Sequence, residues 1–418
     1  MPMENIIDDL IYRGLIQQYS DEAKLREMLE SKQTLYCGFD PSASSMHLGN
    51  YVMISLLKRF QLYGHKVIAL VGGATGMIGD PSGKSKERNL QNEETLKANT
   101  ESIKNQLERY IDLTNEDKGM VVSNYDWLGH MSVIDFLRDY GKFFSINYML
   151  SKEIVKSRLE AGISFTEFSY QILQSIDFYF LHHKYGVNIQ LGGNDQWGNL
   201  TSGLELIRKI DGENETAEVM TAHLILRSDG KKFGKSEKGA LFLDRNLTSP
   251  YALYQYFMNV TDEDAIRFLK IFSFLSKDEI EKVAAEHFAS PGARIGQKKV
   301  AYEVTKDIHG EEAALEAIKM SEALFSGDVA SLKENEIIEL FGEFKKPVEG
   351  EMKLEDLIIN LGLATSKREA RTFITGNSVS INGTKHTDPN EMINSSLALF
   401  NKYLVVKRGK KNHALGEF

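Results

Sequence analysis

A strand, a helix and a second strand follow one another between residues 34 and 71, and this order limits the possible folds more than any other feature. Residues 34–39 are a short apolar run, which is typical of a buried strand. From Gly49 onward apolar side chains recur at helical spacing until Gly64, and residues 66–71 have the composition of another strand. This order is the unit of a parallel α/β sheet, so we expect the chain to begin with such a domain.

The following segments continue this pattern and then become helical. We expect a polar helix over 93–112, and short strands alternating with aromatic-rich helices over 118–183. A strand over 188–191 is followed by a helix over about 195–210. Residues 245–325 have mostly helical periodicity.

The C-terminal part of the chain has the composition of a separate small unit. Residues 347–353 resemble a linker, and 354–408 start with two helices and finish in strands. A chain of 418 residues predicts two or three domains. We expect a parallel-sheet domain over 1–240, a helical domain over 241–345 and an α+β domain over 346–418.

Composition is ordinary for a globular protein. Apolar residues make up 42% of the chain and charged residues 26%. No uncharged apolar run approaches the roughly 18 residues that a membrane helix needs. The first ten residues contain no Lys or Arg and lack the apolar centre of a signal peptide. We therefore expect a cytoplasmic protein with no membrane partner.

The single cysteine, Cys37, excludes a disulfide within the chain and a zinc site built from several cysteines. Cys37 follows a strand residue and precedes a glycine. It could act as a nucleophile, but a small wall residue of a pocket is the simpler interpretation.

Charge is distributed unevenly around a net value of −9. From Lys345 to the end there are 12 Lys and Arg against 8 Asp and Glu. An acidic body with a basic tail suggests that the tail contacts a polyanion, although scattered solvated charge explains this count about as well.

Small and polar residues, among them His47, Gly49 and Asn50, lie where the first strand passes into the helix. Backbone N–H groups at a helix start favour anions, and a histidine there can donate to phosphate oxygens. Gly49 would admit the close approach of a nucleotide. Taken alone, these residues are better explained as a turn without a chemical role.

A basic cluster follows the turn dipeptide at residues 229–230. It contains Lys231, Lys232, Phe233, Gly234, Lys235 and Ser236. Most lysine clusters are solvated surface. The internal glycine, the terminal serine and the position after the second half of the sheet favour a flexible loop that closes lysines onto a triphosphate.

A glycine-rich stretch over 79–85 is one residue short of the phosphate-binding loop pattern, so that motif fails. Its neighbourhood can still bind phosphate through Lys84 and Arg88 as a mobile basic loop.

Three polar residues share one face of the helix expected over 166–185. Tyr170, Gln174 and Asp177 are spaced at i, i+4 and i+7 between strongly apolar neighbours. Polar groups on a buried helix need partners. They could form a structural hydrogen-bond network or line a binding pocket, and the residues themselves leave both open.

Glycines end the strand over 188–191, and Asp195 follows them. Glycines at the carboxyl end of a strand allow a ligand to approach the backbone, and an aspartate can accept hydrogen bonds from ribose. A turn capped by an Asx side chain is the alternative.

Together the two motifs, His47 to Asn50 and Lys232 to Ser236, resemble the signature elements of class I aminoacyl-tRNA synthetases. Lys-Phe-Gly-Lys in the second motif is similar to the tyrosyl-tRNA synthetases of bacteria. The resemblance spans nearly the whole chain. It implies a Rossmann-like catalytic domain, a helical domain and a small C-terminal α+β RNA-binding domain.

The resemblance also implies a role for each motif residue. The groups that act on the ATP phosphates would be His47, Lys84, Arg88, Lys232, Lys235 and Ser236. The tyrosine site would comprise Tyr36, Asp80, Tyr170, Gln174, Asp177, Gln190 and Gln196, with the phenol held by Tyr36 and Asp177 and the ammonium by Asp80, Tyr170 and Gln174. The ATP site would comprise Cys37, Gly38, Asp40, His47, Gly49, Asn50, Gly193, Asp195 and Lys235.

The tail resembles the small RNA-binding domain named after ribosomal protein S-four. The helix around residues 366–371 and the turn over 376–383 carry this likeness. Lys367, Arg368 and Arg371 would face RNA phosphates.

The implied reaction is the activation of L-tyrosine by ATP, followed by transfer of the tyrosyl group to tRNA(Tyr). Mg²⁺ would accompany ATP, with no dedicated metal site and no tightly bound organic cofactor. Relatives are homodimers, and the aromatic segment 130–165 could form that interface. Two alternatives remain: a tryptophanyl enzyme, which should lack the Tyr36 and Asp177 pair, and a catalytically silent RNA-binding protein.

Overall fold

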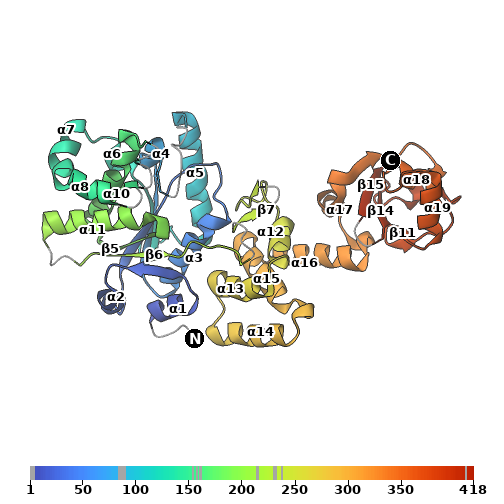
Figure 1. Ribbon diagram of the computed structural model, residues 1–418, viewed down its shortest axis with the longest axis horizontal. Coiled ribbons are helices and arrows are strands. Elements are labelled where there is room, and N and C mark those ends of the chain that lie inside the picture. The colour runs from blue at the N-terminus through green and yellow to red at the C-terminus, as the bar shows by residue number, and fades with distance from the viewer. Residues whose placement is uncertain are drawn as a thin grey trace. The chain divides into compact units, whose positions relative to one another are not determined.

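The computed structural model describes residues 5–82, 91–152, 155–156, 159, 162–212, 216–228, 233–236, 239–409 and 412–418. Contacts divide the chain into two compact units, Met1–Glu311 and Glu312–Phe418 (Figure 1). The finer division at residues 240 and 345 stays a prediction.

The first unit is built on a six-stranded sheet with the order β1-β6-β5-β2-β3-β4. Its strands are β1 Ile16–Tyr19, β2 Thr34–Phe39, β3 Lys66–Val71, β4 Gly119–Ser123, β5 Val187–Gly193 and β6 Glu218–Ala222. Only β1 pairs antiparallel, with β6; the other neighbours in this sheet are parallel. The strands expected at 34–39 and 66–71 are confirmed, and so is the parallel α/β sheet.

The chain reverses its direction of winding between β2 and β5. From β2 it moves outward to β3 and β4, and it then returns to place β5 on the other side of β2. In open α/β sheets, the carboxyl ends of the two strands at such a switch point leave a crevice between them. The topology therefore selects the ends of β2 and β5 as the place for a site.

Helices connect the strands of this sheet (Figure 1). They are α1 Ile6–Tyr12, α2 Glu22–Met28, α3 Leu48–Leu62, α4 Thr75–Ile78, α5 Glu93–Tyr110, α6 Tyr125–Leu128, α7 Val133–Asp135, α8 Ile146–Ser151, α10 Phe165–Tyr185 and α11 Trp197–Asp211. Ser164 caps the start of α10 by accepting from the Glu167 amide, and Gly186 ends the helix in the left-handed region.

The expectation of several strands over 118–183 is wrong, since β4 is the one strand in the described part of that range. Its aromatic residues lie instead in short helical pieces. These pieces pack against α10 and α11 around Met149, Ile172 and Ile176. Packing on a helical surface has overridden the strand preference of aromatic side chains.

A helical region completes the first unit, with α12 Pro250–Met258, α13 Asp262–Phe272, α14 Lys277–Ala289 and α15 Ile295–His309. Two buried arginines tie it to helices α1 and α3. The Arg13 guanidinium donates to the carbonyls of Lys270, Ser273 and Leu275, and Arg59 donates to those of Ile271 and Ser273. These bonds satisfy carbonyls that the end of α13 leaves without helical partners.

The second unit contains α17 Glu334–Phe341, most of α16 Glu311–Ser326, and a five-stranded sheet of order β12-β11-β14-β15-β9. Its strands are β9 Lys345–Pro347, β11 Val379–Ile381, β12 Thr384–Lys385, β14 Tyr403–Arg408 and β15 Asn412–Glu417; β10 Met352–Lys353 pairs separately with β13 Met392–Ile393.

The prediction of a linker over 347–353 is therefore wrong, because strands occupy both ends of this range: β9 ends at Pro347, and β10 is Met352–Lys353. Lys345–Pro347 runs parallel to β15 at the sheet edge, and the Val348 amide donates to the Glu417 carbonyl at 2.8 Å. An edge strand needs only main-chain pairing on one side, so Pro and Gly nearby do not prevent it.

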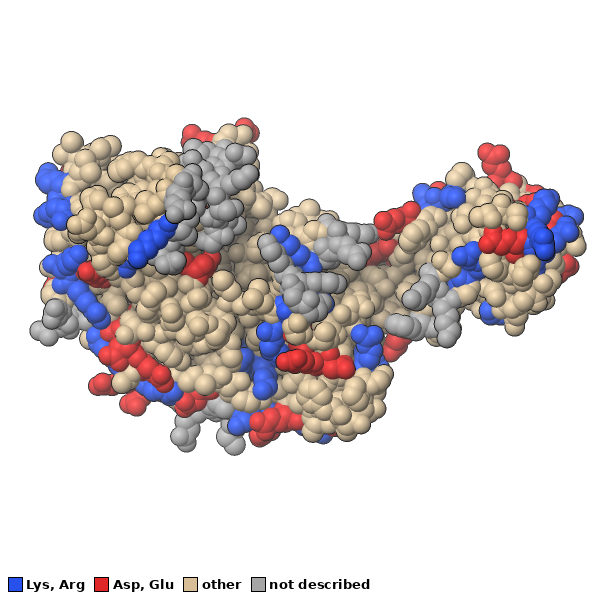
Figure 2. Space-filling view, in the orientation of Figure 1, with Lys and Arg blue, Asp and Glu red and all other residues tan. Residues whose placement is uncertain are grey.

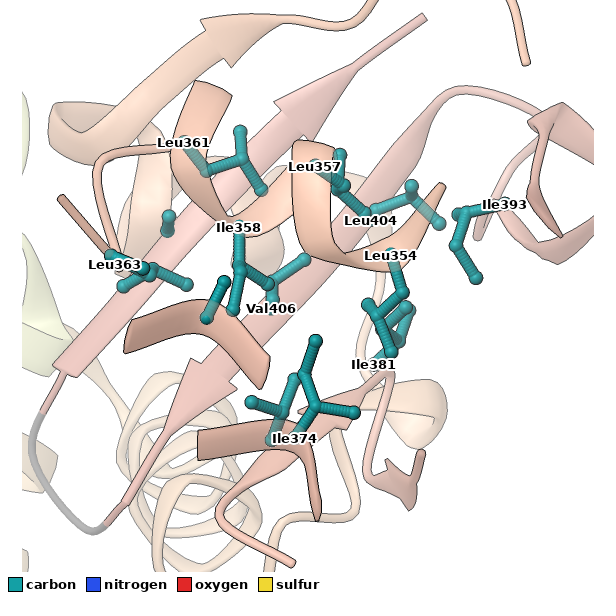
Figure 3. Packing of buried hydrophobic residues seen from close by; sticks show 14 of the residues in the cluster. Leu354, Leu357, Ile358, Leu361, Leu363, Ile374, Ile381, Ile393, Leu404 and Val406 are labelled. Atoms are coloured by element: carbon teal, nitrogen blue, oxygen red, sulfur yellow. The ribbon is translucent and has the colours of Figure 1, made fainter. Parts of the chain in front are cut away.

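Helices α18 Leu354–Asn360 and α19 Lys367–Thr375 contribute to the core of this unit. Figure 3 shows Leu354, Leu357 and Ile358 of α18 meeting Leu404 and Val406 of β14. The two helices and the following strands confirm the α+β architecture expected of the tail. Across both units, no described helix is long and apolar enough to cross a membrane.

Candidate active site

A cavity of about 190 Å³ opens at the switch point between β2 and β5. Its lining joins the ends of both strands to one face of α10. The polar or small residues around it are Tyr36, Cys37, Gly38, Asp40, Ser42, Asn50, Thr75, Asp80, Tyr170, Gln174, Asp177, Gln190, Gly192, Gly193 and Gln196. All seven residues expected to hold tyrosine are among them.

Asp177 and Tyr36 are buried in the wall of this cavity. The Asp177 carboxylate accepts from Asn124 Nδ2 at 2.9 Å and from Trp127 Nε1 at 2.8 Å. The Tyr36 hydroxyl has no hydrogen-bond partner among the described residues. A buried hydroxyl without a protein partner is costly and suits a polar ligand atom.

Burial raises the pKa of Asp177 to about 8, although the hydrogen bonds from Asn124 and Trp127 act in the opposite direction. Burial also raises the pKa of Tyr36 well above its usual value, with a further contribution from Asp177. Tyr36 therefore keeps its proton near neutral pH and can donate it to a ligand.

Tyr170 and Asp40 are joined in the same wall. The Tyr170 hydroxyl donates to Asp40 Oδ2 at 2.8 Å, and Thr75 Oγ1 donates to Asp40 Oδ1 at 2.9 Å. Asp40 thus links the end of β2 to α4 and α10. The Tyr170 oxygen keeps lone pairs that can accept from a bound cation.

Gln174 and Asp80 belong to an amide network in the cavity wall. Asn199 Nδ2 donates to Gln174 Oε1 at 3.0 Å and to Gln196 Oε1 at 3.2 Å, and Gln196 Nε2 donates to Asp80 Oδ2 at 2.6 Å. The network fixes which oxygens face the cavity. It also joins four residues from three segments that lie far apart in the sequence.

Gln190 and Cys37 come from the ends of the two central strands. Gln190 is buried, and its Oε1 atom has no hydrogen-bond partner among the described residues. Burial raises the pKa of the Cys37 thiol to about 12. Cys37 is therefore a protonated wall residue and a poor nucleophile.

His47 is the N-cap of α3. Its Nδ1 accepts from the Gly49 amide at 3.1 Å, and Asn50 Oδ1 accepts from the His47 amide at 3.0 Å, which completes a capping box. Because Nδ1 accepts, a neutral ring carries its proton on Nε2, and that atom can donate a hydrogen bond to an anion. Asn50 keeps an NH₂ group and lines the cavity.

The two sequence motifs meet at this helix start. Gly234 approaches so closely that a Cβ added to it would lie 3.4 Å from the Gly49 nitrogen. The Leu48 amide donates to the Leu241 carbonyl at 2.8 Å, and Lys235–Ser236 (β7) pairs with Gly239–Ala240 (β8). A hairpin carrying Lys235 therefore rises beside the helix that His47 opens.

Some expected site residues do not line the cavity, and others are not among the described residues. Lys84, Arg88 and Lys232 fall outside the described residues, and only the backbone of Ser236 is described. His47, Gly49, Asp195 and Lys235 are near the cavity in the chain but do not line it. The Asp195 side chain lies close to Gly193 in space, since a Cβ added at Gly193 would be 2.7 Å from Asp195 Oδ1.

Sequence reasoning missed Asn124, Trp127, Thr75 and Asn199 as site residues. Asn124 follows β4 directly, and polar residues just after parallel strands are the signal that could have found it. Trp127 and Asn199 lie in helices where nothing in the local pattern marks them. Only the packed fold brings them to Asp177 and Gln174.

The expected RNA-binding cations on α19 are not equivalent. Lys367 pairs with Asp356 at 2.9 Å, and Arg371 pairs with Glu355 at 2.5 Å. Arg368 is exposed, and no ion pair to a described residue is found for it. Figure 2 shows blue Lys and Arg side chains beside red acids where Figure 1 labels α19.

Two protein-family models match separate ranges of this chain. A family model for class I tRNA synthetases (W and Y) matches residues 28–326. A model for the tyrosine--tRNA ligase SYY-like C-terminal domain matches 341–416.

Individual relatives match over nearly the full length. Tyrosine--tRNA ligase 1 of Bacillus licheniformis is 49% identical over 418 residues, covering 99% of each chain. The tyrosine--tRNA ligase of Listeria welshimeri is 48% identical over 98% of this chain and 99% of its own. The crystal structure of a C-terminally truncated mitochondrial tyrosyl-tRNA synthetase from Aspergillus nidulans aligns with a TM-score of 0.70 at 30% identity, covering 77% of this chain and 95% of that one.

Proposed function

The chain belongs to the tyrosine--tRNA ligases of the class I (W and Y) tRNA synthetase family, and from this premise we propose that its cavity binds L-tyrosine and that the neighbouring loops bind ATP. The enzyme activates tyrosine with ATP and passes the tyrosyl group to tRNA(Tyr). The observation that carries the site assignment is the buried Tyr36 hydroxyl, which has no partner among the described residues and lines the cavity with Asp177.

A tyrosine phenol would complete the hydrogen bonds at this end. Tyr36 donates a hydrogen bond to the phenol oxygen, and a carboxyl oxygen of Asp177 accepts a hydrogen bond from the phenol hydroxyl. Asn124 and Trp127 hold that carboxyl in place. Phenylalanine would leave these buried groups unpaired, which is the general basis on which tyrosyl-tRNA synthetases, the established example of this effect, reject it.

The other end of the amino acid carries an ammonium group, for which the wall offers oxygen atoms. We assign the ammonium group to Asp80, Tyr170 and Gln174. Gln196 donates to Asp80, Asn199 donates to Gln174, and Tyr170 donates to Asp40. These bonds orient the three side-chain oxygens. Gln190 and Gln196 would lie along the tyrosyl group.

ATP would lie across the start of α3. A tyrosine carboxylate oxygen attacks the α-phosphorus, and the bond to the β-phosphate oxygen breaks to release pyrophosphate. His47 and Lys235, with Lys84, Arg88, Lys232 and Ser236, would stabilise the charge that develops on the phosphates. The residues assigned to the nucleotide itself are Cys37, Gly38, Asp40, Gly49, Asn50, Gly193 and Asp195.

In the second step, a ribose hydroxyl of the terminal adenosine of tRNA attacks the tyrosyl carbonyl and AMP leaves. Mg²⁺ would arrive with ATP, because phosphate oxygens are preferred ligands of this hard cation. In the described part of the chain, no group of three or more His, Cys, Asp and Glu could hold a metal ion. We place the enzyme in the cytoplasm, where tRNA is charged for translation.

A second copy of this chain is the proposed partner of the aromatic segment. Val133, Ile134, Leu137, Ile146 and Phe165 are each between 52% and 73% exposed. Exposed apolar patches of this kind mark interaction sites. Sedimentation should give a dimer, and Ile134→Asp should shift it toward the monomer; a monomeric parent chain would contradict the interface.

Pyrophosphate exchange with each aromatic amino acid tests the function. Tyrosine should support exchange, whereas phenylalanine and tryptophan should not. Exchange with tryptophan would favour the tryptophanyl alternative. No exchange with any of the three would favour an RNA-binding protein without catalysis.

A further inference from the structure

Phe233, the aromatic residue of the second motif, lies in an aromatic box formed by Tyr256, Phe268 and Phe272 of α12 and α13. Its ring stacks on Phe272 with a centroid distance of 5.2 Å and an interplanar angle of 12°. It lies 5.0 Å from the ring of Phe268 and 6.1 Å from that of Tyr256. The ring therefore attaches the beginning of the hairpin to the helical region.

The next residue strengthens this attachment. The Gly234 amide donates to the buried Tyr256 hydroxyl at 3.0 Å, and the Gly234 carbonyl accepts from the Leu241 amide at 2.9 Å. Gly234 has φ of +71°, a conformation that favours glycine. Its backbone is thus held between the aromatic box and the start of α3.

The aromatic box is itself tied to α3. Tyr51 of α3 stacks on Phe272 at 6.1 Å, and its hydroxyl donates to Asp307 of α15. Near the other end of α3, Arg59 donates to the carbonyls of Ile271 and Ser273. These contacts set the spacing between the box and the helix that begins after His47.

The far side of the hairpin is also attached. His47 forms an isolated bridge with Phe242, and the Leu243 amide donates to the Met46 carbonyl at 2.8 Å. Both ends of the hairpin are therefore held, one through Phe233 and the other by pairing with residues 46–48. Losing either attachment would change the position of Lys235.

We propose that Phe233 is a positioning residue for adenylate formation: by occupying the aromatic box, it aligns the hairpin so that Lys235 reaches the phosphates beside His47. This inference rests on the proposed function. Phe233 is not among the residues found around the tyrosine cavity. Its loss should therefore slow chemistry and leave tyrosine binding unchanged, because a displacement of about 1 Å can cost about 10²-fold in rate.

The test compares Phe233→Ala and Phe233→Leu with Phe257→Leu in the full-length enzyme. Phe257 packs on Phe268 and Phe272 in the same core. Its truncation therefore disturbs the packing of the helices and keeps the Phe233 ring. Stopped-flow fluorescence gives the adenylate rate and the tyrosine Kd, and thermal unfolding gives the cost in stability. Tyr256→Phe provides a second variant, which removes the acceptor for Gly234 and keeps the aromatic packing.

We expect Phe233→Ala to slow adenylate formation by about 10²-fold, with tyrosine Kd within about twofold of the parent. Phe233→Leu should recover most of the rate, Tyr256→Phe should lose about tenfold, and Phe257→Leu should stay within about twofold despite a lower Tm. An unchanged rate in Phe233→Ala would overturn the inference. So would an equal loss in Phe257→Leu, since that would indicate general destabilisation. If the parent chain itself gave no tyrosine-dependent exchange, the proposed function would be wrong.

Discussion

The side chains of Tyr36 and Asp177 show how single residues define the substrate. Each is buried, yet the Tyr36 hydroxyl has no protein partner among the described residues, and Asp177 accepts from only two N–H donors of the described chain. A carboxyl group can form more hydrogen bonds than these two, so capacity remains for a ligand. At this scale, the proposed selectivity would follow from buried polar atoms that are fully paired only when tyrosine is bound.

Replacing Asp177 with Ala should weaken tyrosine binding by about ten- to a hundredfold, because the buried phenol hydroxyl then loses its partner, a loss of about 1–3 kcal/mol. The preference over phenylalanine should shrink together with it. Equilibrium binding and exchange with both amino acids measure these effects. Tyr36→Phe is the matched control for the neutral hydroxyl, with an expected loss of about fivefold. Unchanged discrimination in Asp177→Ala would remove the phenol assignment.

Asp177 should also leave a signature in the pH dependence of stability. Burial raises its pKa to about 8 in the folded chain, against 3.8 for the ordinary group. Between these values the folded state holds a proton that the unfolded state has lost, so a rise in pH favours unfolding. Relative to Asp177→Asn, the parent's free energy of unfolding should fall by at most ~1.4 kcal/mol per pH unit over this range. Urea titrations at about pH 5 and about pH 7 test it, and a constant difference would contradict it.

At the scale of elements, a helix start and a hairpin bring together the groups proposed to bind ATP. Helix α3 carries His47 as its cap, and the β7–β8 hairpin places Lys235 beside it through the close contact of Gly234 with Gly49. In the C-terminal unit, the three cations of α19 are not equally available to a partner. Lys367 and Arg371 form ion pairs with acids of α18.

Lys235→Ala should slow adenylate formation by about 10²–10³-fold, the loss typical of one preorganised donor. Tyrosine Kd should hardly move, because Lys235 does not line the tyrosine cavity. Stopped-flow measurements separate the two quantities. A Kd that weakened as much as the rate fell would make Lys235 a structural residue instead.

Arg368→Ala should weaken tRNA binding more than Lys367→Ala, although both remove one positive charge from α19. Lys367 must leave its pair with Asp356 before it can reach a phosphate, whereas Arg368 is exposed. The slope of log K against log salt should fall by about one for Arg368→Ala and by less for Lys367→Ala. Equal slopes in the two variants would show that the ion pair has no effect.

At the scale of the molecule, the proposed site of amino-acid activation lies in the first unit, and the proposed RNA-binding residues lie in the second. The cavity, α3 and the hairpin all lie within Met1–Glu311. The expected RNA-binding residues lie within Glu312–Phe418, in a unit with its own core.

A fragment ending at Ser326, the last residue of α16, should keep tyrosine-dependent pyrophosphate exchange within about threefold of the parent. It should lose most tRNA charging, by about 10²-fold or more, because the basic surface is gone. The cut avoids Pro347, which belongs to strand β9. Full charging by the fragment would contradict the role of the tail.

Local pattern was sufficient wherever neighbouring residues decide the outcome. The strands over 34–39 and 66–71 and the face of Tyr170, Gln174 and Asp177 follow from periodicity, which depends on a few turns of chain. The pattern failed at Lys345–Pro347, because an edge strand is created by the pairing of β15 and not by its own side chains.

The parallel sheet, the order of the two motifs and the polar face of α10 could all be predicted from the amino-acid order. Tertiary packing was needed to bring Asn124 and Trp127 to Asp177, to place Phe233 in an aromatic box, and to pair Lys367 and Arg371 with acids. The physical reason is distance along the chain. Hydrogen bonds and packing between segments 50 residues apart depend on how elements pack, and no local periodicity records that.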